Sequence, residues 1–565
     1  MVRITVILLF FLCISLYADK FQLVFEGQKQ VSERELYEAI NLYKPYMYEF
    51  YKEEPKIDEK TLNFSLQILQ NYYKTKGFYH TKISYSFNEN ALFVHVEEGE
   101  AVVIKELVVS SDKEIQTFLG LAKGENFDAT KFTQSKKNIK LAYANYNYCN
   151  IVLDAKAWVD IEKNEAYLSY IVTPNKLCTF GKVSIHPSAN IDAEILESLL
   201  YFEEGDPFSL KIITQSYENL YAHEGISKAV IDTKVDENNR VNTVVTVSEN
   251  EKPIRFETGF GVSSDEGFMA SIGVKHRNMF TNLKTAGIEA RVTEVKQSLK
   301  ATYDMPLAKK NATGVEIGVD NEIFEGFTEN RLYSELYLKQ RVIPNSFKES
   351  LLFDSTTTYN SSDLELFPEG NLFILSPILD WNYDVRDKLL DPKNGYFLNA
   401  NVMGSLKSTL SDASYYKFKL MGGYILPLFE ETLAFRATFG SLETYEGELP
   451  ASYRFYAGGM HSNRGYIYRG LGPTNAEGDP SGSESIFEAT LEYRFKIYDG
   501  FKGVVFSDNT FLGDNYKPNY ENGYFSAGAG LRYMTPIGSI AFDLGFDTKN
   551  PPEQYAFHFH IGELF

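Results

Sequence analysis

The sequence predicts three small α+β domains followed by a sixteen-stranded antiparallel transmembrane β-barrel. Three observations support this prediction. A pattern of strand, short helix, longer helix, strand and strand occurs three times between residues 19 and 250. From Ile254 onward the helical periodicity disappears, and apolar and polar residues alternate with a period of two. Strand-like segments then continue to the last residue, Phe565.

The composition agrees with several domains and a membrane interface. A chain of 565 residues is longer than one hydrophobic core requires. Aromatic residues make up 15% of it, with 39 Tyr, 42 Phe and 2 Trp, which fits strands that meet a bilayer, although a soluble aromatic-rich β protein would have the same composition. The formal net charge of −20 argues against a nucleic-acid partner.

Residues 1–18 have the features of a secretory signal peptide. Arg3 supplies the positive start, residues 4–16 the apolar segment, and Ala18 the small residue before a cut at Asp19. No later segment approaches the roughly 18 consecutive apolar residues of a spanning helix. We therefore expect an exported protein, which would be in a membrane only as a barrel.

The three repeated units are expected at residues 19–98, 99–176 and 177–250. In the first, Ser32 and Glu35 have the spacing of a capping box, and the longer helix stops at Gly77. Asn147 and Gly225 end the corresponding helices of the other two units. Each longer helix has one apolar face, formed by Leu62, Leu66, Leu69 and Tyr73, by Phe132, Ile139, Tyr143 and Tyr146, and by Ile213, Tyr217 and Leu220.

Two questions about these units stay open at this level. Their exposed sheet edges fit either simple spacers or surfaces that accept a client strand by β-augmentation. Cys149 and Cys178 could form a disulfide in an oxidising compartment, and two buried free thiols fit equally well.

Residues 251–565 are expected to form the barrel. Sixteen strands are predicted, an even number as closure of a single chain requires, near 254–262, 267–276, 285–293, 296–304, 312–321, 331–341, 349–359, 372–383, 395–404, 414–426, 431–442, 486–497, 502–508, 523–534, 539–547 and 555–564. Short turns marked by Pro or Gly are expected on one side, at 304–306, 391–395, 426–428 and 535–538, with longer loops on the other, above all 443–485 and 508–522. This asymmetry favours an outer-membrane barrel over a soluble sandwich.

No set of residues indicates an enzyme, a metal site or a cofactor. The eight His lack metal-ligand spacing, and His558 and His560 are expected to face the lumen from the last strand. Arg464 lies in the longest loop and is either solvated or buried against a carboxylate. The alternation of side chains along its strand points Glu492 into the lumen as the partner of Arg464. Asp508 is a second candidate, but the direction of its side chain is ambiguous because the apolar Phe506 lies on the same face of the strand.

The loop sequence Arg464-Gly465-Tyr466 resembles the loop-six signature of the Omp85 superfamily of outer-membrane barrel-assembly proteins. The repeated units resemble its periplasmic POTRA domains, of β-α-α-β-β order. The resemblance implies that Glu492 and Asp508 hold Arg464, although Ser507-Asp508-Asn509-Thr510 departs from the family pattern. The end of the chain is similar to the C-terminal signal of such barrels at Phe557, Phe559, Ile561 and Phe565.

Three POTRA domains are similar to the TamA branch of the superfamily. The resemblance implies insertion or translocation of unfolded outer-membrane clients, such as autotransporters, and a TamB-like inner-membrane-anchored partner bound through the first domain. A two-partner secretion transporter, a passive pore and a lipid-transport component are the alternatives. We expect strand 254–262 to pair weakly with strand 555–564, in a lateral seam that includes Phe256, Gly259, Gly261, Phe559, Ile561 and Gly562.

Overall fold

The computed structural model describes residues 20–45, 53–88, 91–186, 188, 190–307, 311–389, 391–428, 431–498, 500–535, 538–551 and 553–561. The expected signal peptide lies outside these residues. The chain forms two compact units, one mainly of residues up to 180 and one mainly of residues 242–565, which also takes in most of the third domain. Within the described ranges, no helix has the length and apolar character needed to cross a membrane.

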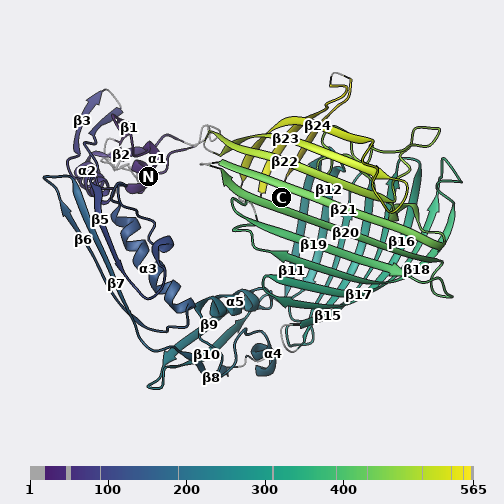
Figure 1. The fold of residues 1–565 in the computed structure, drawn as a ribbon, viewed down its shortest axis with the longest axis horizontal. Coiled ribbons are helices and arrows are strands. Elements are labelled where there is room, and N and C mark those ends of the chain that lie inside the picture. Colours follow the sequence, from purple (N-terminus) through teal and green to yellow (C-terminus); the bar gives the residue numbers. More distant parts are fainter. Residues whose placement is uncertain are drawn as a thin grey trace, which may run out of the picture. The chain divides into compact units, whose positions relative to one another are not determined.

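The first domain packs two helices on a mixed sheet (Figure 1). Its elements are β1 (Lys20–Glu26), α1 (Glu33–Ala39), β2 (Lys56–Asp58), α2 (Glu59–Thr75), β3 (Lys82–Asn88) and β4 (Ala91–Glu97), in the sheet order β2-β1-β4-β3. The capping box predicted at Ser32 and Glu35 is present. Leu69 and Tyr73 on α2 are buried in the core, as the apolar face predicts. The three-residue strand β2 was not predicted.

The second domain repeats this plan with a shorter first helix. It contains β5 (Val103–Ser110), the 3-10 turn η1 (Gln116–Phe118), α3 (Ala129–Asn145), β6 (Ile151–Asp160) and β7 (Glu165–Pro174), in the order β5-β7-β6. Asn147 has a φ of 68° and ends α3 as predicted. Tyr146 follows the helix and is 40% exposed, so its placement on the buried face was wrong.

A disulfide joins Cys149 to Cys178, with their Cα atoms 5.8 Å apart. It links the segment after α3 to the start of the third domain and decides between the two alternatives left open by the sequence. Because the bond closes a loop across a domain boundary, it limits the conformations of that connection.

The third domain contains β8 (Thr179–His186), α4 (Ala193–Ser198), α5 (Leu210–Tyr221), β9 (Ile226–Val235) and β10 (Arg240–Glu249), in the order β8-β10-β9. The repeat predicts that Gly225 ends α5 in a left-handed conformation, and this prediction was wrong, because its φ angle is not positive. A Cβ at Gly225 would instead lie 2.8 Å from the Leu283 side chain and 2.9 Å from the carbonyl oxygen of Arg277. The glycine is therefore needed where the barrel approaches this domain.

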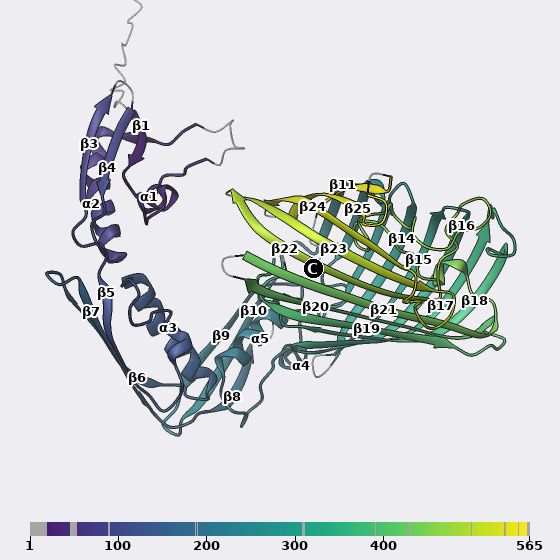
Figure 2. The same ribbon diagram turned by 45° about the horizontal axis from the view of Figure 1, so that its top comes forward.

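Sixteen antiparallel strands form one sheet in sequence order, from β11 to β26 (Figures 1 and 2). They are β11 (Ile254–Ser263), β12 (Gly267–His276), β13 (Thr285–Val292), β14 (Lys296–Leu307), β15 (Asn311–Phe324), β16 (Phe327–Val342), β17 (Asn345–Tyr359), β18 (Gly370–Asp384), β19 (Gly395–Ser405), β20 (Ala413–Leu428), β21 (Glu431–Gly447), β22 (Ser485–Tyr498), β23 (Phe501–Gly513), β24 (Gly523–Thr535), β25 (Gly538–Asp547) and β26 (Tyr555–Ile561).

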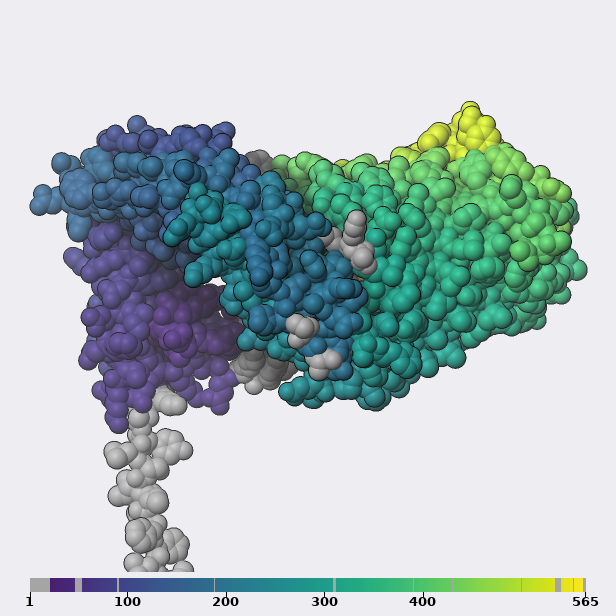
Figure 3. Space-filling view, turned by 90° about the horizontal axis from the view of Figure 1, so that it is seen from below, coloured from purple at the N-terminus to yellow at the C-terminus, as the bar shows by residue number. Residues whose placement is uncertain are grey.

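Alternation along the strands separates a lipid-facing surface from a polar lumen. On β16, Leu332 and Leu336 are 55% and 51% exposed and face outward. Tyr333 faces the lumen, and its ring lies 2.5 Å from where a Cβ of Gly318 would be. The inward aromatic side chain thus occupies space that the glycine on β15 leaves free. Figure 3 shows one side of the barrel as a continuous surface.

The strands extend beyond the turns expected from prolines. Pro306 lies within β14 opposite Ala312, and Pro427 lies within β20 opposite Thr432, so the turns predicted at 304–306 and 426–428 were wrong. A proline near a strand end removes only one donor from the ladder, and the strand can continue past it. The predicted turn at 535–538 falls partly outside the described residues.

The expected difference in loop length holds only for part of the barrel. The external connections 264–266, 293–295 and 325–326 are short, whereas 360–369 and 448–484 are long. On the opposite side, the connections 277–284 and 385–394 are longer than two-residue turns. The first of these is explained by its contact with the third domain.

The β12–β13 turn binds the third domain in an unusual backbone conformation. Four consecutive residues other than glycine have left-handed φ angles: Phe280 (58°), Thr281 (70°), Asn282 (58°) and Leu283 (60°). The Asn282 side chain donates to Asp192 Oδ2 at 2.8 Å and accepts from the Asp192 N–H at 2.9 Å, while Leu283 is 1% exposed. Such a conformation costs about 1–2 kcal/mol per residue, so these contacts must stabilise it.

An ion-pair cluster lies beside this turn. Glu224 of the third domain lies 3.1 Å from Lys275 Nζ and 3.2 Å from Arg255 Nη1, which belong to β12 and β11. Burial alone would raise the pKa of Glu224, but the hydrogen bond and charge of Lys275 and the charge of Arg255 outweigh it and lower the pKa. The first two barrel strands are therefore attached to the third domain at the end of the barrel from which β11 starts.

Candidate functional site: the lumen loop and the seam

Residues 448–484, here called the lumen loop, connect β21 to β22 and fold back inside the barrel. Phe455, Ala457 and Leu471 of the loop are buried in one cluster with strand residues such as Tyr415 and Ile486. Short bridges between Ala457 and Leu471 and between Phe455 and Ser483 give the loop a hairpin-like backbone. A loop of this length is usually mobile, but here its own apolar side chains fix it to the inner wall.

The tip of the loop, residues 458–467, turns tightly around Arg464. Gly458 and Gly459 have φ angles of 99° and 101°, which other residues adopt only with strain. The Gly459 N–H donates to the Tyr466 carbonyl at 3.0 Å and closes the turn. Asn463, which is fully buried, accepts from Ser526 Oγ at 2.6 Å and ties the tip to β24.

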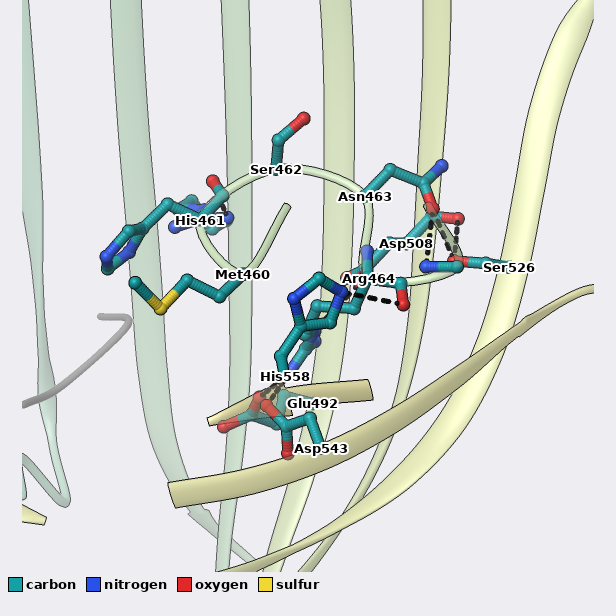
Figure 4. A network of polar contacts seen from close by, with 12 residues as sticks. Met460, His461, Ser462, Asn463, Arg464, Glu492, Asp508, Ser526, Asp543 and His558 are labelled. Carbon is teal, nitrogen blue, oxygen red and sulfur yellow. Dashed lines mark hydrogen bonds and ion pairs between the residues drawn. The ribbon is translucent and has the colours of Figure 1, made fainter. Parts of the chain in front are cut away.

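Arg464 lies inside the barrel and is 1% exposed, so it is not a solvated loop residue. Its Nε and Nη2 donate to the two carboxylate oxygens of Asp508 at 2.8 and 3.0 Å, which is a bidentate fork. Its Nη1 donates to Glu492 at 2.8 Å and to Asp543 at 3.3 Å (Figure 4). The structure thus brings Arg464 together with both carboxylates that the sequence analysis named, and with a third.

The third carboxylate, Asp543 on β25, was missed. It follows the same parity rule as Glu492, because its neighbours Phe542 and Leu544 face outward, and that alternation could have revealed it. The ambiguity at Asp508 also has a physical explanation. Phe506 does face the lumen, and the Arg464 guanidinium stacks on its ring at 3.4 Å from the centroid.

The carboxylates have arginine partners of their own. Arg494 Nε donates to Glu492 at 2.7 Å, and Arg532 donates to both oxygens of Asp543 at 2.6 and 2.9 Å. Each of the three carboxylates is therefore paired with at least one buried arginine. Removing one member of such a buried set leaves an unpaired charge, which is far more costly than losing an exposed ion pair.

Glycines make room for the loop tip against the wall. A Cβ at Gly465 would lie 2.6 Å from the Ser526 Cβ, and one at Gly545 would lie 2.1 Å from the Arg464 carbonyl oxygen. The predicted motif residue Tyr466 packs edge-on against Tyr524 at 5.9 Å between ring centroids. The Arg464-Gly465-Tyr466 sequence therefore combines a charged anchor, a close approach and an aromatic contact.

The seam lies between β11 and β26, the two edges of the sheet, which are neighbours in space. Among the described residues no β-ladder joins them, which differs from the weak pairing predicted for 254–262 with 555–564. Their backbones are linked where the Ser264 N–H, just beyond β11, donates to the Phe559 carbonyl at 3.1 Å.

The predicted seam residues take two orientations. Phe256 on β11 and Phe557, Phe559 and Ile561 on β26 have outward-facing side chains, and Phe256 is 74% exposed. Gly259 and Gly261 face the lumen, where a Cβ at Gly259 would lie 2.7 Å from Ser271 Oγ. Gly562 and Phe565, the remaining predicted residues of the seam and the C-terminal signal, lie outside the described part of the chain.

No group of three or more His, Cys, Asp or Glu side chains in the described residues is arranged to hold a metal ion. The site consists of buried ion pairs, close packing and a strand edge that has no ladder partner among the described residues.

Two family models match this chain. The Omp85 superfamily domain matches residues 285–565. The POTRA model, described as surface antigen variable number repeat, matches residues 22–99, 100–175 and 178–250.

Relatives of the same kind match almost the whole chain. The outer membrane protein assembly factor BamA of Nitratidesulfovibrio vulgaris is 22% identical over 97% of this chain and 73% of its own length. The BamA of Neisseria meningitidis serogroup B is 19% identical over 96% of this chain and 77% of its own length. The crystal structure of BamA from Haemophilus ducreyi lacking POTRA domains 1–3 has the same fold, with a TM-score of 0.55 and 16% identity over 81% of this chain and 99% of that one.

The fold defines an outer-membrane β-barrel with three periplasmic α+β domains. The chain belongs to the Omp85 superfamily, and its periplasmic domains are POTRA domains. Both of these relatives are BamA proteins, whereas the sequence motifs are similar to the TamA branch.

Proposed function

We propose that this protein inserts β-rich client proteins into the outer membrane by adding a client strand to β11 at the seam. The observation that carries the proposal is the edge of β11, which forms no ladder with β26 in the described residues. The two BamA relatives, named as outer membrane protein assembly factors, support the same kind of activity.

Backbone hydrogen bonding supplies the driving force. A strand edge inside a bilayer has no water to satisfy its N–H and C=O groups, and each unsatisfied group costs several kcal/mol. An unfolded client has the same requirement as it enters the membrane. Pairing a client strand with β11 would satisfy both sets of groups, which is β-augmentation.

The barrel wall is also short at this point. β11, β12 and β13 have 10, 10 and 8 residues, whereas β16, β20 and β21 have 16, 16 and 17. A spanning strand needs roughly 9–11 residues, so β11 and β12 match the hydrocarbon core with little to spare, and β13, with 8 residues, is shorter than this range. A short wall lets the local bilayer thin, which favours entry of polar chain segments.

Photo-crosslinking tests the proposal directly. A photoreactive residue at Phe260, which is 78% exposed on β11, should capture nascent outer-membrane proteins in living cells. Leu336 on β16 is the matched control, because it is 51% exposed on the same outer surface but far along the sheet from β11. Equal capture at the two positions, or capture of lipid alone at Phe260, would contradict strand addition.

We further propose a TamA-like division of labour, in which a restricted set of clients such as autotransporters is handled together with a TamB-like partner. The three POTRA domains support this proposal. Depletion should then reduce only some outer-membrane proteins, and crosslinks from Phe64, 66% exposed on the first domain, should reach an inner-membrane-anchored protein. Loss of all outer-membrane barrels on depletion would indicate a BamA-like role, and loss of one secreted protein a two-partner transporter.

A further inference from the structure

The connection between β11 and β12 reaches into the barrel at the external end of the seam. Asp265, in this short connection, is 8% exposed. Its Oδ2 accepts from the N–H of Met460, at the tip of the lumen loop, at 3.0 Å. A Cβ at Gly459 would lie 2.6 Å from the same oxygen, so the loop tip is shaped to admit this carboxylate.

His558 on β26 completes the contact from the other side of the seam. Its Nδ1 lies 3.4 Å from Asp265 Oδ1 and 3.2 Å from Ser264 Oγ. Its Nε2 donates to the Arg464 carbonyl at 3.2 Å, as Figure 4 shows. The imidazole ring, which is 1% exposed, therefore touches both the first hairpin and the anchored loop tip.

These contacts place three separate elements at one point. The β11–β12 connection comes from one edge of the sheet, β26 is the other edge, and the loop tip is fixed to the wall by Arg464. The backbone hydrogen bond from Ser264 to Phe559 lies at the same level. The external end of the seam is thus closed by side chains and by the loop, where a β-ladder would otherwise close it.

We propose that Asp265 and His558 are positioning residues that form a latch across the external end of the seam. The latch couples the lumen loop to both edge strands, so that displacement of the loop tip releases β11 from β26. Its role as a gate for clients rests on the proposed function, whereas its effect on the separation of the two strands does not.

Spin-label distances measure that separation without any client. Labels on cysteines at Thr258 of β11 and Phe557 of β26, in the full chain in nanodiscs, should report one short distance. Asp265→Ala or His558→Ala should increase the population with longer distances roughly tenfold, because each removes hydrogen bonds of a buried polar contact. The double variant should open the seam no further than either single variant, since the two residues act as one unit.

The control is Glu266→Ala in the same connection, whose carboxylate lies 2.6 Å from Arg291 Nη2 and takes no part in the latch. If Asp265→Ala does not fold, as judged by heat-modifiable gel mobility, Asp265→Asn keeps an acceptor for Met460 and loses the charge facing His558. Unchanged distances in the latch variants, additive effects in the double variant, or equal opening by Glu266→Ala would overturn the latch.

Client capture at Phe260 separates the latch from the proposed function. Opening of the seam without any increase in capture would contradict strand addition and leave the latch in place. Capture at Phe260 that continues although the latch variants leave the strand separation unchanged would contradict the latch and leave the proposed function in place.

Discussion

The wall behind the lumen loop and the seam differ in how their strands are held. β22 and β23 have 14 and 13 residues, pair along their length, and carry Glu492 and Asp508, which form buried ion pairs with Arg464. β11 has 10 residues, pairs along its length with β12 alone among the described strands, and is otherwise attached near its two ends. The periplasmic end is bound by Glu224 and the external end by the contact of Asp265 with His558.

Because of this difference, the stability of the barrel wall and the opening of the seam depend on different contacts. A strand that is fixed at its ends and unpaired along one edge can exchange partners without unfolding the sheet. The wall of β22–β25 provides a rigid support for the loop tip, which in turn holds the external end of the seam. Each variant below changes one of these attachments.

Arg464→Ala should have the largest effect. It leaves Asp508 without its bidentate partner, and breaking a buried ion pair in this way costs about 3–5 kcal/mol. We expect the lumen loop to leave the wall and become accessible to protease, and client assembly to fall. Arg464→Lys should be intermediate, because an ammonium group retains the charge but cannot form the fork.

The matched control for this variant is Arg454→Ala. Arg454 lies in the same loop and donates to the Ser481 carbonyl at 2.9 Å, but no ion pair between it and a carboxylate is observed among the described residues. Proteolysis of the lumen loop that is as slow in Arg464→Ala as in Arg454→Ala would show that the arginine does not fix the loop.

Gly545→Ala should displace the loop tip while every charge remains. The new Cβ would lie 2.1 Å from the Arg464 carbonyl oxygen, and overpacking of this kind costs about 1–3 kcal/mol. Gly273→Ala on β12 is the control, since the nearest atom to its Cβ would be 3.6 Å away. Urea unfolding followed by heat-modifiable gel mobility compares the two, and equal midpoints would contradict the close approach.

Glu224→Gln tests the periplasmic attachment of β11. Its ion pairs are partly exposed, so we expect a loss of about 1 kcal/mol. Because the folded pKa of Glu224 is lowered from 4.5, the stabilisation is present above that pH and is lost as the pH falls through the folded value. Protection of the turn 277–284 against hydrogen exchange, after correction for the intrinsic pH dependence of the exchange rate, should therefore fall on acidification in the wild type.

The pH dependence distinguishes this residue from its neighbours. The corrected protection of the turn in Glu224→Gln should be lower at neutral pH and change less on acidification. Glu218→Gln, an exposed carboxylate on α5, should behave like the wild type. An identical acid response in all three proteins would exclude Glu224 as the group responsible.

Thr281→Gly should have the smallest effect and the opposite sign. The left-handed backbone at Thr281 destabilises the fold by about 1–2 kcal/mol. Glycine avoids this strain but lowers the free energy of unfolding by about 0.5–1 kcal/mol, because it gives the unfolded chain more conformational freedom. We expect the turn to be stabilised by a few tenths of a kcal/mol up to about 1 kcal/mol. Faster hydrogen exchange in the variant would show that the threonine side chain is needed.

The sequence predicted the order and number of the barrel strands because lipid on one side and a polar lumen on the other impose strict alternation. The predicted ends of these strands were less accurate. Pro306 and Pro427 suggested turns, but these residues lie near strand ends, where a missing donor is tolerated. The short strand β2 has only three residues and too little pattern to be recognised.

Parity within single strands pointed to Glu492 and would have identified Asp543, because both alternate with outward apolar neighbours. It failed at Asp508, since Phe506 faces inward in order to stack on Arg464. The contact of Asp265 with His558 could not be predicted, because it depends on where the first connection, the last strand and the loop tip meet.

The left-handed turn between β12 and β13 limits where the chain can be cut into fragments that fold independently. Its conformation is stabilised by Asp192 and by the space beside Gly225, both in the third POTRA domain. A barrel produced without that domain would have nothing to maintain this geometry at the base of its first hairpin. The smallest autonomous fragment should therefore begin ahead of β8, and one beginning at residue 251 should refold in lower yield.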